Sequence, residues 1–143
     1  MAKTNLSNLR VFIEDDIKIH EYYRKLTKAG NIEDSPFQDM PDVFVAATCI
    51  GAKNNSYKEL KKKKDVFLAA ALDQEFQIPV LTSLAYKKQG NLETFLELDR
   101  VLSICEGWAN GGILLLYDIL MEGKGLQPLY RLVDYIINEQ PNN

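Results

Sequence analysis

The stretch Glu97–Gly123 restricts the fold of this chain more than any other part of its 143 residues. Apolar or small residues recur along it at spacings of three and four, which places them on one face of a helix. They are Leu98, Val101, Leu102, Cys105, Trp108, Ala109, Gly112, Leu116, Ile119 and Leu120. Ile104, Leu115 and Tyr117 lie off that face, so a second side of the helix must also be covered. Because a helix of this kind usually lies at the centre of a domain, we expect a fold organised around a helix near residues 97–122.

Further helices are expected on both sides of the central one. The spacing of apolar residues predicts them from after Asp16 to Ala29 and over 37–51, 57–73, 79–89 and 126–140, with Gly, Pro and Asn marking the turns. Residues 10–13 fit either a short strand or the start of a helix, and residues 1–9 and 140–143 are expected to be frayed. The chain therefore predicts an all-α fold, a compact single-domain bundle of five or six helices, with at most a minor strand near residues 10–13.

The second of these helices contains a proline. Pro41 removes one backbone hydrogen bond and crowds the preceding turn, so the helix either kinks there or begins at that residue. Ser35 and Gln38 have the spacing of a capping box, with Pro36 at the first helical position, which offers an earlier start. Gly51 is expected to end this helix.

Composition and charge exclude several classes of protein. The net charge of −3 and the isoelectric point of about 5.2 give the whole chain no electrostatic attraction for nucleic acid. Cys49 and Cys105 are far apart and sit on apolar faces, which indicates reduced, buried thiols. No apolar leader is visible, and the longest strongly apolar run, Ile113–Tyr117, is too short to span a bilayer. We expect a soluble, cytoplasmic protein that does not enter a membrane.

Catalytic and metal-binding patterns are not visible in the sequence. The chain has one histidine, His20, among charged residues of a predicted surface helix, and a general base needs placed partners. Carboxylates at Glu14, Asp15, Asp16 and Glu21 could hold a divalent cation, but an acidic first turn of a helix explains them better. The motifs of common hydrolases, phosphate-binding loops and dinucleotide-binding folds are missing. We expect no enzyme, no metal site and no cofactor.

A run of lysines is the best candidate for contact with nucleic acid. Its members are Lys58, Lys61, Lys62, Lys63 and Lys64. Binding to phosphates needs clustered cations, and the start of the helix predicted over 57–73 would add backbone N–H groups. Such runs are more often a solvated face, and the net charge of the chain is negative. Contact with nucleic acid is therefore the alternative rather than the first hypothesis.

The most unusual short sequence is Trp-Ala-Asn-Gly-Gly at 108–112. One interpretation is a partner-binding surface, with Trp108 as an anchor, Asn110 as a hydrogen-bonding group, and Gly111 and Gly112 allowing a partner's backbone to approach. The other interpretation is helix packing inside the domain, because a tryptophan on an apolar face is more often part of a core. Both interpretations stay open at this stage.

Three segments together carry a resemblance to a known family: FQDMPDVFVAATCIGAKNN at 37–55, LKKKKDVF at 60–67 and ICEGWANGGILLL at 104–116. They resemble the small accessory proteins encoded beside bacterial DNA phosphorothioation genes, the family of DNA phosphorothioation-associated protein 4. The matching positions are Phe37, Asp39, Met40, Asp42, Val43, Phe44, Ala46, Ala47, Ile50, Gly51, Trp108, Ala109, Asn110, Gly111 and Gly112. Departures from the family's pattern are Pro41 in place of lysine, Glu106 and Gly107 in place of paired glutamates, and Trp108 in place of tyrosine.

The resemblance implies a context rather than a chemistry. It implies an accessory or adaptor subunit of a bacterial DNA-modification-linked or anti-phage defence complex, acting by docking on a larger protein subunit. The expected docking face consists of Trp108, Asn110, Gly111 and Gly112, supported from beneath by Phe37 and Phe44. Self-association through the central or last helix is a further expectation. The alternative is a subunit that contacts nucleic acid through Lys58 and Lys61–Lys64.

Overall fold

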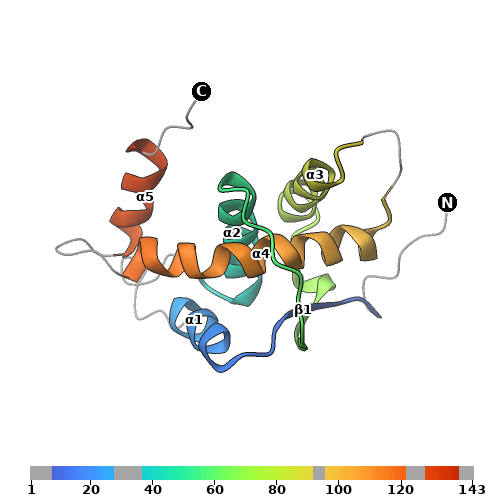
Figure 1. The fold of residues 1–143 in the computed structure, drawn as a ribbon, viewed down its shortest axis with the longest axis horizontal. Coiled ribbons are helices and arrows are strands. Elements are labelled where there is room, and N and C mark those ends of the chain that lie inside the picture. Colours follow the sequence, from blue (N-terminus) through green and yellow to red (C-terminus); the bar gives the residue numbers. More distant parts are fainter. Residues whose placement is uncertain (1–7, 28–36, 92–95, 122–127, 139–143) are drawn as a thin grey trace.

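The computed structural model describes residues 8–27, 37–91, 96–121 and 128–138. Its elements, in chain order, are β1 (Arg10–Glu14), α1 (Ile17–Thr27), α2 (Met40–Lys53), β2 (Lys63–Leu68), the 3-10 helix η2 (Ala69–Ala71), α3 (Gln77–Gln89), α4 (Leu98–Met121) and α5 (Pro128–Asn138). Figure 1 shows α4 running across the molecule, with α2 crossing its middle and α3 and α5 on either side of α2. The prediction of a mainly helical fold around a central helix is confirmed.

The middle of α4 packs directly on α2. A Cβ atom added to Gly51 of α2 would overlap the carbonyl oxygen of Trp108, and one added to Gly112 of α4 would overlap the carbonyl oxygen of Ala47. Glycine is therefore needed on both helices at their crossing, because any side chain would push the backbones apart. This contact also explains why Gly51 does not end α2 as predicted: the helix continues to Lys53, and Gly51 lies inside it.

The start of α2 settles the question raised by its proline. Asp39 is the N-cap residue, and its side chain accepts a hydrogen bond from the backbone N–H of Asp42. Pro41 occupies the first turn, where its missing N–H would have no partner in the helix in any case. The helix thus begins near Pro41, and Gln38 precedes it. Ser35 and Pro36 lie outside the described residues.

The prediction of a helix over 57–73 is wrong. This segment runs extended from Ser56, forms β2 and ends in η2. β2 pairs antiparallel with β1, with an irregularity in the register between Val11 and Phe12. Because β1 buries Val11 and Ile13, its backbone needs a pairing partner, and β2 provides one. The pairing places residues 63–68 in a strand, and the alanines that follow form only the short 3-10 helix η2. Of the two alternatives at residues 10–13, the strand is the correct one.

The remaining helices match their predictions within the described residues. α1 turns Tyr23 and Leu26 inward, and α3 ends at Gly90, which adopts a positive φ of 74°. Cys105 is buried and Cys49 half-buried, and both are free thiols. Among the described residues, no helix is both long and apolar enough to cross a membrane. Of the ends predicted to be frayed, 1–9 and 140–143, residues 1–7 and 140–143 lie outside the described ranges. For Leu9 the prediction is wrong, because it packs against the core and its carbonyl oxygen accepts a hydrogen bond of 2.9 Å from the N–H of Ala69.

Candidate partner-binding surfaces

Most of the 108–112 segment lies in the core. The side chain of Trp108 is 1 % exposed, and its Nε1 donates a hydrogen bond of 2.9 Å to the carbonyl oxygen of Leu84. Its ring meets that of Tyr57 edge to face, with centroids 5.2 Å apart. A Cβ atom on Gly111 would overlap the backbone of Ser56. Trp108, Gly111 and Gly112 therefore hold α4 against its neighbours, as the internal-packing interpretation predicts, and offer no exposed face.

The supporting aromatic residues show the same division between core and surface. Phe44 is fully buried and packs edge to face on Phe67 of β2, with ring centroids 5.8 Å apart. Phe37 is only partly buried and packs against the edge of the core. Neither residue forms a platform beneath an exposed tryptophan, because Trp108 itself points inward.

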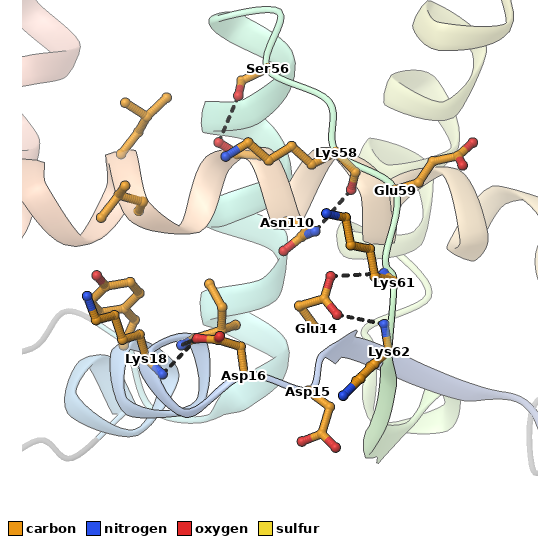
Figure 2. A pocket seen from close by; sticks show the side chains of 15 residues that line it. Glu14, Asp15, Asp16, Lys18, Ser56, Lys58, Glu59, Lys61, Lys62 and Asn110 are labelled. Atoms are coloured by element: carbon orange, nitrogen blue, oxygen red, sulfur yellow. Dashed lines mark hydrogen bonds between the residues drawn. The ribbon is translucent and has the colours of Figure 1, made fainter.

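Asn110 differs from its neighbours because it reaches an open cleft. Its Nδ2 donates a hydrogen bond of 3.1 Å to the carbonyl oxygen of Lys58. The cleft has a volume of about 980 Å³ and lies between the start of α1, the extended segment 56–62 and the middle of α4 (Figure 2). Its apolar floor is formed by Ile19, Tyr22, Leu114 and Leu115. We call it the Asn110 cleft.

Three of the four carboxylates that line the Asn110 cleft, those of Glu14, Asp15 and Asp16, are bound to backbone N–H groups or to a histidine. Glu14 accepts hydrogen bonds from the backbone of Lys61 at 2.9 Å and of Lys62 at 2.7 Å, and the bond from Lys61 is the main cause that lowers the pKa of Glu14. Asp16 caps α1 by accepting the N–H of Lys18 at 2.9 Å. These roles fit the interpretation of the acidic residues as the start of a helix.

Asp15, a member of the predicted acidic cluster, forms a close pair with His20. The Oδ1 of Asp15 lies 2.8 Å from Nε2 of His20, and this hydrogen bond is the main cause that lowers the pKa of Asp15. Both side chains are partly exposed to solvent. Within the described residues, no three His, Cys, Asp or Glu side chains are placed to hold a metal ion together.

The lysine run lies on the extended segment and on β2. Successive side chains of a strand point to opposite sides, so the run does not form one continuous basic face. The ammonium group of Lys63 lies 5.8 Å from the ring centre of Phe12, and Lys62 and Lys64 lower the pKa of Asp15 through their charges. Arg10 on the neighbouring strand is already paired with Asp65 at 2.8 Å.

Glu106 is a buried carboxyl group that sequence reasoning noted only as a departure from a pattern. It is 5 % exposed, and its Oε2 accepts a hydrogen bond of 2.9 Å from the backbone N–H of Phe12, at the irregularity in β1. Burial raises the pKa of Glu106 from 4.5 to about 7. This residue joins β1 to α4. The available signal was a single acidic residue between Cys105 and Gly107 on the apolar part of the central helix.

The clearest exposed apolar surface belongs to α5. Sequence reasoning recognised its apolar residues as one face of a helix but did not say whether that face is covered. The structure leaves Tyr130, Val133, Ile136 and Ile137 exposed, with 65 % of Ile136 and 61 % of Ile137 open to solvent. We call these four residues the α5 face.

Polar contacts hold α5 in place. The guanidinium of Arg131 donates a hydrogen bond of 2.9 Å to the carbonyl oxygen of Asp118 at the end of α4. Tyr135 accepts a hydrogen bond of 3.3 Å from the side-chain amide of Asn54, and the ammonium group of Lys53 lies 4.0 Å from the centre of its ring. These contacts fix α5 with the α5 face turned to solvent.

The comparisons with known proteins agree with the resemblance seen in the sequence. The family model described as DNA sulphur modification system-associated protein 4 matches residues 17–143. Searches against curated proteins and solved structures give no match. The matched range includes all five helices, the Asn110 cleft apart from its residues 14–16, and the α5 face.

Proposed function

This chain belongs to the family of DNA sulphur modification system-associated protein 4, and we propose that within such a system it is a non-enzymatic adaptor. In this proposal it docks onto a larger protein subunit of a bacterial DNA-modification or anti-phage defence complex. Trp108 is not the anchor of the docking surface, since that side chain is buried. The docking surface is the α5 face.

The exposure of the α5 face is the observation that carries this proposal. Large apolar side chains gathered at one place on a surface are typical of sites where another protein binds. Each such side chain contributes about 1.5–3 kcal/mol when it leaves water completely. Val133 and Ile136 are therefore strong candidates for anchors of an interface, because both are substantially exposed on a helix that Arg131 and Tyr135 hold in place.

A role without catalysis is consistent with how the ionisable groups are used. Catalytic acids and bases are usually free to meet a substrate in a cleft. Here Glu14 and Asp16 bind backbone N–H groups, His20 is paired with Asp15, and Glu106 is bound to the backbone of β1. These groups are engaged in structural contacts.

Contact with nucleic acid through Lys58 and Lys61–Lys64 is the weaker proposal. It predicts binding that weakens uniformly across sequences when the lysines are neutralised, and that falls steeply with salt. The nearby carboxylates of Asp15 and Asp65 reduce the positive potential of this region. Absence of DNA or RNA binding at low salt would remove this alternative.

The experiment that tests the adaptor proposal is affinity purification of the tagged chain from its native host at physiological salt, with and without nuclease. We expect a stoichiometric larger protein of the same sulphur modification system that persists after nuclease treatment. Recovery of proteins that are lost with nuclease would favour the nucleic-acid alternative. Recovery of no such subunit under either condition would contradict the adaptor proposal.

A further inference from the structure

We infer that the Asn110 cleft binds an acidic, amphipathic segment of a partner protein. The inference deepens the adaptor proposal, since the segment would belong to a larger subunit of the same system. It concerns a surface separate from the α5 face: the Asn110 cleft lies between α1 and the 56–62 segment, whereas the α5 face lies on the last helix.

Lysine side chains line the Asn110 cleft, and the charge of Lys61 is one of the causes that lower the pKa of Glu14. Lys58 and Lys61 extend from the 56–62 segment over the middle of α4, and Lys18 lies across the opening on α1 (Figure 2). Among the described residues, the ammonium groups of these three lysines form no hydrogen bond and no close ion pair. They are therefore available to an incoming anionic group.

The negative groups near the Asn110 cleft are placed differently. Both oxygens of Glu14 accept backbone N–H groups of the 61–62 turn, and Asp16 caps α1. Figure 2 shows Asp15 and Glu59 pointing away from Asn110. The lining holds four carboxylates and four lysines, and half of the carboxylate oxygens are already engaged. An acidic ligand that enters above α4 would therefore meet the free ends of Lys58 and Lys61 rather than Asp15 or Glu59, which point away.

The apolar floor of the Asn110 cleft favours an acidic peptide over a nucleic acid as the anionic partner. Ile19, Leu114 and Leu115 are aliphatic, and Leu114 is half-exposed. Single-stranded nucleic acids bind by stacking bases on aromatic rings, and the ring of Tyr22 is already packed on that of Tyr117, with centroids 4.5 Å apart. Apolar side chains of a helix or extended segment fit such a floor, as in other grooves that bind amphipathic peptides. A cleft of about 980 Å³ has room for several of them.

The test uses overlapping synthetic peptides that cover the larger proteins encoded with this chain in one sulphur modification system. Binding is measured by fluorescence anisotropy, and its location by amide shifts of Ile19 and Leu115 in NMR spectra. We expect the binding peptides to be acidic and amphipathic. Their Kd should rise at least about tenfold in the double variant Lys58→Glu with Lys61→Glu, because each exposed charge pair contributes modestly and two are reversed. Changing the facing acids of the peptide to lysine should restore binding.

The matched control is Lys63→Glu with Lys64→Glu, which makes the same change in net charge on β2, outside the Asn110 cleft. The inference is overturned if no peptide binds, if the control weakens binding as much as the cleft variant, or if duplex or single-stranded DNA shifts the same amides when acidic peptides do not. If the peptide experiment contradicts the inference but the larger subunit still co-purifies with the chain, the adaptor proposal is not affected. Failure of co-purification with intact peptide binding would remove the adaptor proposal alone.

Discussion

Gly51 of α2 and Trp108 of α4 meet backbone to backbone, with no room for even a methyl group between them. Trp108 then turns its ring away from this crossing, toward α3, where it binds the carbonyl oxygen of Leu84. Two glycines, Gly51 and Gly112, thus set the distance between the two most extensively packed helices. The unusual sequence around Trp108 is explained by this crossing.

Gly51→Ala is expected to lower the free energy of unfolding by about 1–3 kcal/mol or more, because the added methyl group would force α2 and α4 apart. Urea unfolding followed by circular dichroism measures this loss. Gly90→Ala is the control: a methyl group there meets nothing within 4 Å, and only the positive φ of 74° opposes it. Equal losses in both variants would contradict the close helix crossing.

Trp108→Phe separates stability from partner binding. The substitution removes the hydrogen bond from Nε1 to Leu84 and should lower the free energy of unfolding by about 1 kcal/mol. Because Trp108 is buried, the folded variant should retain the larger subunit at the wild-type level in co-purification. If the folded variant no longer co-purified with the larger subunit, Trp108 would contribute to partner binding after all.

Glu106 should make the stability of the chain depend on pH. Its pKa of about 7 in the folded protein lies above the ordinary 4.5, so the folded state keeps the proton longer than the unfolded state. The ionisation of Glu106 therefore does not lower the free energy of unfolding below about pH 4.5. Its cost grows as the pH rises to about 7 and reaches about 3 kcal/mol above that. Chemical unfolding across this range measures it.

Glu106→Gln is the matched variant, because glutamine keeps the size of the side chain and an oxygen that accepts the N–H of Phe12. The difference in unfolding free energy between the variant and the wild type should increase in the variant's favour from pH 4.5 to 7. Comparison by difference cancels the opposite contributions of Glu14 and Asp15, whose pKa values are lowered. A difference that stays constant with pH would show that the pKa of Glu106 is not raised in the folded protein.

Glu14 holds the turn that carries the lysines next to the Asn110 cleft. Glu14→Gln removes the charge of the group that accepts two successive backbone N–H groups, so the amides of Lys61 and Lys62 should exchange with solvent faster. Hydrogen exchange followed by NMR measures this change. Glu59→Gln on the same segment is the control, since its carboxylate accepts no hydrogen bond among the described residues. Unchanged exchange in the Glu14 variant would contradict this role.

The sequence was sufficient to predict the parts of the fold that local patterns determine. The apolar spacing along 97–122 predicted α4, and Gly90 correctly marked the end of α3. The resemblance built on residues 37–116 predicted the family. In each of these cases, the signal lies within one element or within short matching segments.

The parts that were not predicted depend on contacts between distant residues. β2 forms because β1, some fifty residues earlier in the sequence, needs a partner, and no local pattern reports that need. The spacing of apolar residues in the last helix does not show whether its apolar side is buried or exposed. The exposure of the α5 face depends on how α5 packs against α4, which only the structure gives. The Asn110 cleft likewise combines α1, the 56–62 segment and α4.

The most direct test of the adaptor account is the affinity of the purified chain for the larger subunit that co-purifies with it, measured by calorimetry for the wild type, Ile136→Asp and Val80→Asp. Val80 is the control because it is 40 % exposed and lies on α3, away from the α5 face. The account predicts that Ile136→Asp raises Kd at least about tenfold, while Val80→Asp leaves it unchanged. Equal affinity of the wild type and Ile136→Asp would contradict docking through the α5 face.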